Sequence, residues 1–237
     1  MSLYLILDLS SLAVPFLFSF HPKLKFYKEW PYFFPALLLT GLFFVVWDVY
    51  FTKWGVWGFN PRYLEGIYLS GLPLEEYLFF ICIPFASIFT IHAFRKIYPD
   101  FTIKPILLKS IVGILSGILL LTGLIFHENW YTFSTGIISG ILILWSYFIC
   151  RNALHHFFLT YPVILIPFFI VNGILTGSFI EGEVVWYNDE ENLGIRMFTI
   201  PLEDTFYGMS MLLMTVMLSA FFKQKFSTKL HGDQRSE

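Results

Sequence analysis

The sequence predicts an all-α polytopic membrane protein with seven transmembrane helices, and three observations support this fold class. Of the 237 residues, 57% are hydrophobic and only 14% are charged, whereas a soluble domain carries roughly a quarter charged residues. Several apolar runs reach the length of about 20 residues that a helix needs to cross a bilayer. A short acidic motif also occurs twice, about 128 positions apart.

The repeated motif reads Pro-Leu-Glu-Glu at 73–76 and Pro-Leu-Glu-Asp at 201–204. A proline in the first turn followed by acids is an ordinary helix start, so one copy alone would indicate only a helix boundary. The same offset also aligns Asn60 with Asn188, and a Gly-Ile pair at 66–67 with another at 194–195. Matches in the same order and spacing indicate an internal duplication.

Seven expected spans follow in chain order, at about 2–20, 30–51, 73–93, 105–126, 132–150, 159–179 and 200–222. The duplication relates the third span to the seventh, so the two three-helix repeats run in the same direction and are joined by a linking helix (3+1+3). The expected segments are repeat 1 at 1–93, a linker with the fourth helix at 94–131, repeat 2 at 132–222, and a polar tail at 223–237. We expect the tail to be disordered and cytoplasmic.

Lysine and arginine placement predicts the orientation of the chain. The loops 21–29, 94–104 and 151–158, the tail and the flanking Lys109 carry twelve of the fifteen basic residues, and the other side carries Lys53, Arg62 and Arg196. The basic side is expected to be cytoplasmic, with the N-terminus outside and the C-terminus inside a multi-pass protein of the cell membrane. The N-terminus lacks a basic region and a small-residue cleavage site, so its apolar run is expected to be a retained span.

Six acids are expected at one depth, near the outer face of the membrane. Asp8 begins an inward span and Asp48 ends an outward one, at the level of the two motifs, and Asn172 lies late in the sixth span. Acids inside a membrane usually face the bundle interior or a cavity, so we expect one shared pocket. Asp8 can alternatively bond a neighbouring helix, and Asp48 can simply mark the end of a span. The six acids are Asp8, Asp48, Glu75, Glu76, Glu203 and Asp204.

The second outer loop holds Arg196, five positions before Pro201. We expect it to pair with Glu203 or Asp204, and anchoring at the interface is the alternative. The acidic run 189–191 is typical of a solvated loop.

Several chemistries lack a motif in this sequence. There is no G-x-G-x-x-G after a strand pattern, no P-loop, no H-E-x-x-H and no paired C-x-x-C, so no cofactor and no metal site are expected. A net charge of −2 gives no reason to expect nucleic acid as a partner.

Carboxyl groups in an apolar aromatic pocket suit acid–base chemistry on a hydrocarbon. An alkene is a poor base, and a carboxyl group beside another in dry surroundings can hold its proton at neutral pH. The carbocation that follows needs negative charge and aromatic faces nearby. Aromatic residues are also typical of membrane interfaces. Those near the two motifs are Trp54, Trp57, Tyr63, Tyr77, Phe79, Trp186, Tyr187 and Tyr207.

Five motifs carry a resemblance to a known family. These are the two acidic motifs, Trp-Gly-Phe-Asn at 57–60, Trp-Tyr-Asn at 186–188 and Gly-Ile-Arg at 194–196. In these motifs the sequence resembles the small integral-membrane lycopene cyclases. These occur as two-subunit bacterial forms, fused chains and parts of fungal bifunctional proteins. The resemblance spans essentially the whole chain, in fused form. It implies closure of β-ionone rings on lycopene or another linear carotenoid, without a dinucleotide fold. The catalytic candidates are Glu75, Glu76, Glu203 and Asp204. The candidates for substrate binding or support are Asp8, Asp48, Trp57, Asn60, Asn172, Tyr187, Asn188 and Arg196.

Two other functions fit the same sequence. Parallel repeats with intramembrane acids also occur in transporters of small solutes, and a non-catalytic carotenoid-binding protein would show the same apolar spans. Expression in a lycopene-producing host separates them, because only a cyclase produces cyclic carotenes. Besides the substrate and the lipid bilayer, the candidate partners are a second copy of the chain and other enzymes of the carotenoid pathway.

Overall fold

Helices dominate the computed structural model, which describes residues 1–233. The short 3-10 helix η1 (Phe26–Glu29) precedes α2, and the single residue Cys150 separates α5 from α6. The helices are α1 (Leu3–Phe18), α2 (Trp30–Trp54), α3 (Leu74–Ile97), α4 (Pro105–Ile125), α5 (Trp130–Ile149), α6 (Arg151–Leu175) and α7 (Leu202–Asp233).

Within the described residues, six helices are long and apolar enough to cross a membrane, and α1 is shorter, with 16 residues. At 1.5 Å per residue α1 is about 24 Å long, against about 30 Å for the hydrocarbon core. Large apolar side chains cover the outside of the bundle: Leu38, Ile114 and Ile166 are each more than 60% exposed. Such a surface suits lipid, and the chain is a membrane protein.

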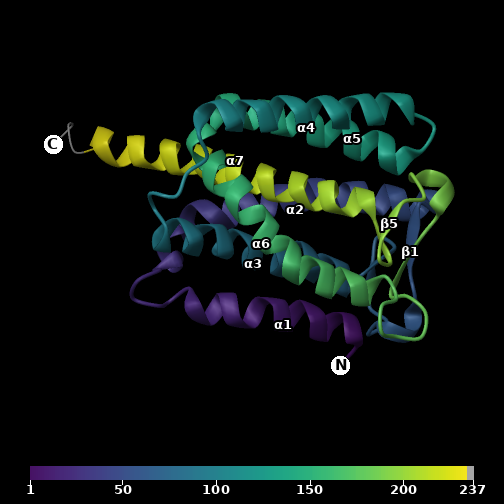
Figure 1. Cartoon of the computed structure of the whole chain (residues 1–237). Coiled ribbons are helices and arrows are strands. Elements are labelled where there is room, and N and C mark those ends of the chain that lie inside the picture. Colours follow the sequence, from purple (N-terminus) through teal and green to yellow (C-terminus); the bar gives the residue numbers. More distant parts are fainter. Residues whose placement is uncertain (234–237) are drawn as a thin grey trace.

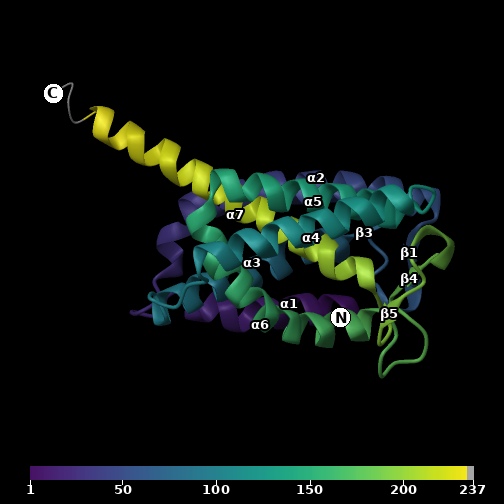
Figure 2. The same cartoon turned by 45° about the horizontal axis from the view of Figure 1, so that its top comes forward.

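The helices run roughly alongside one another (Figure 1). The α4–α5 hairpin covers one side of the bundle and α1 the other, with α2 and α7 between them, and the turned view gives a second angle on the same packing (Figure 2). The hairpin packs closely because Gly136 has no side chain: a Cβ there would lie 2.6 Å from the carbonyl oxygen of Leu119 in α4.

Short strands gather at the end of the bundle that holds the N-terminus (Figure 1). β1 (Trp57–Phe59) pairs antiparallel with β4 (Val185–Tyr187), and Gly58 lies opposite Trp186. Two small hairpins, β2 (Tyr68–Leu69) with β3 (Leu72–Pro73) and β5 (Arg196–Met197) with β6 (Ile200–Pro201), lead directly into α3 and α7.

The strand contacts repeat with the spacing of the duplication. The Asn60 amide donates to the carbonyl oxygen of Val184 at 2.8 Å, and the Asn188 amide donates to that of Val56 at 2.9 Å. The β1–β4 pair therefore ties the two halves together around an approximate two-fold relationship, and it places the start of α3 beside the start of α7.

Two sequence predictions about polar segments were wrong. The stretch 151–158, expected to be a loop, is the first part of α6, and α7 continues through the expected disordered tail to Asp233. Hydropathy marks only the apolar part of a helix, whereas lysine, glutamine and arginine extend helices readily into water. The last part of the predicted tail, 234–237, lies outside the described residues.

Candidate active site

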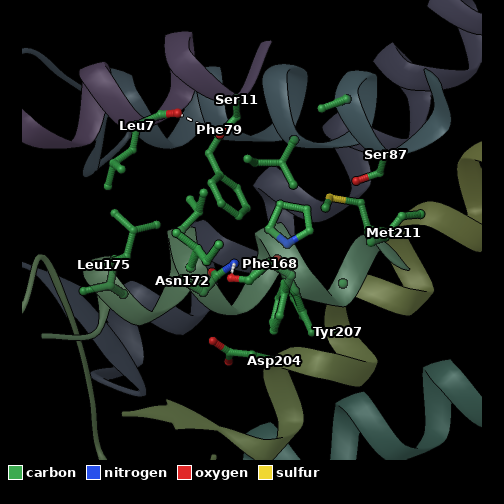
Figure 3. A pocket seen from close by; sticks show the side chains of 18 of the residues that line it. Leu7, Ser11, Phe79, Ser87, Phe168, Asn172, Leu175, Asp204, Tyr207 and Met211 are labelled. Atoms are coloured by element: carbon green, nitrogen blue, oxygen red, sulfur yellow. Dashed lines mark hydrogen bonds between the residues drawn. The ribbon is translucent and has the colours of Figure 1, made fainter. Parts of the chain in front are cut away.

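A cavity of about 530 Å³ lies among α1, α3, α6 and α7. Figure 3 shows side chains from these four helices turned toward one space, among them Leu7, Phe79, Phe168 and Tyr207. Along α3 the lining runs from Glu76 to Thr90, which corresponds to about 21 Å of helix. The cavity is therefore long and largely apolar, with the dimensions of a small-molecule site.

Three carboxyl groups, from Asp48, Glu76 and Asp204, line the cavity, and each residue is less than 9% exposed. Glu76 is in the first turn of α3 and Asp204 in the first turn of α7. Residues of β1 and β4 also line the cavity, so the carboxyl groups lie at its strand-covered end.

Glu76 and Asp48 are both buried at this end of the cavity, and the two carboxyl groups interact electrostatically. The Tyr4 hydroxyl donates to Oε2 of Glu76 at 2.6 Å, and the indole N–H of Trp57 donates to Oδ1 of Asp48. Two buried carboxylates close to each other repel, so this pair favours a state in which one carboxyl group carries a proton.

Asp204 has different surroundings. The Tyr131 hydroxyl donates to its Oδ1 at 2.6 Å, and the Tyr187 hydroxyl donates to its Oδ2 at 3.0 Å. Burial raises the pKa of Tyr187 well above its usual range, and the nearby Asp204 raises it further, so this hydroxyl keeps its proton. Hydrogen bonds to both of its oxygens favour the anion of Asp204, and burial opposes it.

The other acid of each motif does not line the cavity. Glu75 accepts from the Ser2 hydroxyl at 2.8 Å and from the Glu65 amide at 2.6 Å. Glu203 accepts from the Thr132 hydroxyl at 2.5 Å and from the Leu193 amide at 2.9 Å. These bonds hold the hairpins onto the helix starts.

Asp8 also lies outside the cavity lining. It is fully buried, neither of its carboxyl oxygens has a hydrogen-bond partner, and Glu75 of α3 is its strongest electrostatic neighbour. The prediction of one pocket shared by six acids was therefore wrong: Asp48, Glu76 and Asp204 line the cavity, and Asp8, Glu75 and Glu203 do not. Neighbouring helical residues point about 100° apart, which separates the members of each motif.

Asn172 lines the cavity from α6, and its side-chain amide donates to the carbonyl oxygen of Phe168 at 3.3 Å (Figure 3). Asn60 and Asn188 instead lie in the loops. Their side-chain oxygens accept from the backbone two residues on, at 3.1 Å in each case, and start the 3-10 helices η2 (Pro61–Tyr63) and η3 (Asp189–Glu191).

The expected pairing of Arg196 with Glu203 or Asp204 was wrong. Its guanidinium group binds Oδ1 of Asp189 at 2.6 Å and the carbonyl oxygen of Thr199 at 2.8 Å. Partial burial raises the pKa of Asp189, but hydrogen bonds from Arg196 and Asn192 outweigh this and lower it. Asp189, the first residue of the acidic run, is exposed, and Arg196 forms its ion pair with this residue and not with an acid of the cavity.

Of the aromatic residues near the motifs, Trp57, Phe79, Tyr187 and Tyr207 line the cavity. The ring of Tyr207 packs edge-on against Phe44 and Trp47, with centroids 5.0 Å apart in each pair. The others are peripheral: Trp54 and Trp186 are exposed, and the hydroxyls of Tyr63 and Tyr77 donate to loop carbonyl oxygens.

Sequence reasoning missed Tyr4 and Tyr131, the residues that donate to the two cavity-facing acids. The duplication does not reveal them because they are not related by the 128-residue offset. Thr132, which is the residue at that offset from Tyr4, binds Glu203 instead. The one signal available in the sequence is that each half carries a tyrosine near the start of its first helix.

Comparison with known proteins identifies the family of the chain. No curated protein and no solved structure matches the chain. The protein-family model described as lycopene cyclase matches residues 1–94 and 128–222, which leaves out only the linker and the C-terminal end. The two matched regions cover most of the sequence and contain both acidic motifs. The chain therefore belongs to the lycopene cyclase family, whose members are carotenoid cyclases acting in the membrane.

Proposed function

We propose that this protein is a lycopene β-cyclase, which closes β-ionone rings on a linear carotenoid without net redox chemistry and is thus an intramolecular lyase or isomerase. The observation that carries the proposal is the position of Asp48, Glu76 and Asp204 at one end of a long apolar cavity. A polyene end group can reach the carboxyl groups while the rest of the chain stays among apolar side chains.

The proposed acid is the Glu76–Asp48 pair. Because two buried carboxyl groups that interact electrostatically do not both ionise readily, one of them carries a proton. Glu76 gives this proton to the terminal double bond at its less substituted carbon, and the cation forms on the dimethyl carbon. The next double bond along the chain attacks this cation and closes a six-membered ring.

The proposed base is Asp204. Tyr131 and Tyr187 donate to its two oxygens and favour the anion, which stabilises the ring cation and then removes a proton to leave the β-end. The faces of Trp57, Phe79 and Tyr207 line the same space and offer further stabilisation. One proton enters and one leaves, so the stoichiometry requires no redox cofactor.

The proposed membrane arrangement has seven spans in a 3+1+3 pattern, with the N-terminus outside and the C-terminus in the cytoplasm. Repeat 1 (1–93) and repeat 2 (132–222) then flank a linker with the fourth helix (94–131), and the tail 223–237 lies inside. The shortness of α1 fits if the adjoining apolar Phe20, which is 52% exposed, and local thinning of the bilayer complete the crossing. Reporter fusions at each terminus test the orientation: a C-terminal fusion active only outside the cytoplasm contradicts it.

Expression in a lycopene-producing host tests the function. We expect β-ended cyclic carotenes with the native chain and unchanged lycopene with Glu76→Gln, at equal membrane abundance. Purified protein in lipid should work without added nicotinamide or flavin. Unchanged lycopene with an abundant, inserted native chain would contradict the cyclase assignment, and bound but unconverted lycopene would favour a carotenoid-binding protein.

A further inference from the structure

The strongest feature that the proposed reaction leaves unused is Asp8, in the second turn of α1. Its side chain has no exposed surface, and neither carboxyl oxygen has a hydrogen-bond partner. An isolated carboxylate in such a place costs several kcal/mol. A group retained at this cost in the middle of a membrane protein is a candidate for proton handling.

The surroundings of Asp8 support this role. The titratable groups that interact with it electrostatically are Tyr4 on its own helix and Glu75, Glu76 and Cys82 on α3. None of these groups is a cation, so none of them stabilises the carboxylate form of Asp8 by charge pairing. Asp8 thus interacts with Glu75, which is outside the cavity lining, and with Glu76, which is part of it.

Glu75 connects Asp8 to the protein surface. One of its oxygens accepts from the Ser2 hydroxyl and the Glu65 amide, and the other, Oε2, is buried without a partner. The Ser2 amide in turn donates to Oε1 of Glu65, whose side chain is 37% exposed. Hydrogen-bonded polar groups thus lead from solvent to Glu75, the first acid of the motif.

The second half has no such route. Glu203 accepts the matching bonds from Thr132 and Leu193, but the residue at the repeat offset from Asp8 is Gly136, in the α4–α5 contact. Among the residues that the structure describes, only the first half places a second buried carboxyl group, Asp8, near its motif.

We propose that Glu75 and Asp8 form a proton relay that returns a proton from solvent to Glu76 after each ring closure. The inference rests on the proposed function, because it requires Glu76 as the donor. In each cycle Glu76 loses its proton to the substrate and Asp204 gains one from the ring. A proton then leaves the Glu75–Asp8 pair for the Glu76 carboxylate, water restores the pair through the Ser2 end, and Asp204 releases its proton.

The test is deuterium incorporation by the purified full chain in lipid vesicles containing lycopene, in heavy water. A working relay places about one non-exchangeable deuterium in each new ring, because the proton given by Glu76 comes from solvent. Without the relay, Glu76 recovers the substrate-derived proton from Asp204 across the cavity, and that proton enters the next ring. Asp8→Asn and Glu75→Gln are therefore expected to lower the deuterium content per ring.

The same variants should separate the first turnover from the following ones. We expect a first ring closure at the native rate and a steady-state rate reduced about tenfold, since only reprotonation is impaired. Asp8→Glu, which keeps a carboxyl group, should restore both readouts. Glu203→Gln is the matched control, and its deuterium content should equal that of the native chain whatever its rate.

Deuterium content is a ratio within the product, so it can be read even from a variant that folds poorly. Native deuterium content and an undisturbed ratio of first to later turnovers in both Asp8→Asn and Glu75→Gln would overturn the relay while leaving the cyclase intact. A native chain that forms no ring would instead refute the proposed function itself.

Discussion

The two halves of the chain share their loop geometry but differ at the acids that face the cavity. In the first half, Glu76 faces a second carboxyl group, Asp48. In the second half, Asp204 faces two tyrosine hydroxyls, at 2.6 and 3.0 Å. The residue at the repeat offset from Asp48 is Thr176, which binds backbone oxygens of α6. Duplication thus supplies two equivalent positions, and their neighbours suit one carboxyl group to donate a proton and the other to accept one.

Replacing Glu76 should have the largest effect on ring formation, because it removes the proton donor of the first half. Glu76→Gln keeps the size and the contact with Tyr4 but removes the proton, so we expect ring formation to fall about 10²- to 10⁴-fold, the usual contribution of a general acid. Carotene formation per amount of inserted protein is the measurement. Glu75→Gln, one residue away, should be affected less. Equal losses in the two variants would contradict the separation of roles within the motif.

Asp204→Asn should reduce turnover about 10²- to 10³-fold, because an amide neither stabilises the cation as an anion does nor accepts the ring proton. Products should be analysed by mass, since a cation that is not deprotonated can be trapped by water as an alcohol. Near-native production of cyclic carotene by this variant would show that the base lies elsewhere, and Glu203→Asn at the neighbouring position serves for comparison.

The tyrosines that hold Asp204 should have intermediate effects. Each hydroxyl donates a hydrogen bond to a charged group, worth about 1.5–3 kcal/mol, so Tyr131→Phe and Tyr187→Phe are each expected to slow turnover about tenfold or more. Tyr4→Phe removes the donor to Glu76 and probes the same feature in the first half. If neither Tyr131→Phe nor Tyr187→Phe changes the rate, the anionic role of Asp204 is wrong.

The strand pair between the halves can be tested through stability. A methyl group on Gly58 would overlap the indole ring of Trp186, lying 2.8 Å from its Nε1 atom. Gly58→Ala should therefore lower stability by about 1–3 kcal/mol, as overpacking does. Thermal unfolding in detergent measures the loss. The double variant with Trp186→Leu should recover most of it, and a failure to recover would mean that the indole is not the obstacle.

The smallest expected effect lies in the second loop. Hydrogen bonds from Arg196 and Asn192 lower the pKa of Asp189, so its contribution to stability is present above about pH 4, the usual value, and is lost as pH falls through the folded value. Because Asp189 is 56% exposed, solvent screening limits this to about 0–1 kcal/mol. Unfolding of the native chain and of Asp189→Asn should differ slightly at pH 7 and coincide only once the pH is below the lowered pKa of Asp189; a difference that persists there would contradict the assignment.

The sequence alone determined the class of the protein, the seven helices and the two acid motifs. The length of an apolar run reflects the free energy of transferring its side chains from water to lipid. This free energy depends on composition, so it can be judged without knowing which residues are in contact. The duplication was readable because both loops keep the same hydrogen bonds, such as those from Leu74 and Leu202 to Ile67 and Ile195, at 2.9 Å each. Because the two loops have the same backbone geometry, the residues that this geometry requires recur at the same spacing in both halves of the sequence.

The tertiary structure decided which acids meet and what surrounds each of them. Asp48 reaches Glu76 only because α2 lies beside α3, and Tyr131 reaches Asp204 only because α5 lies beside α7. Arg196 pairs with Asp189, seven positions away, and not with Glu203 or Asp204, which sequence proximity suggested. The helical twist turned Glu75 and Asp8 away from the cavity that Glu76 lines. Each of these outcomes depends on the direction of a side chain and on helix neighbours distant in sequence, and neither hydropathy nor motif spacing carries that information.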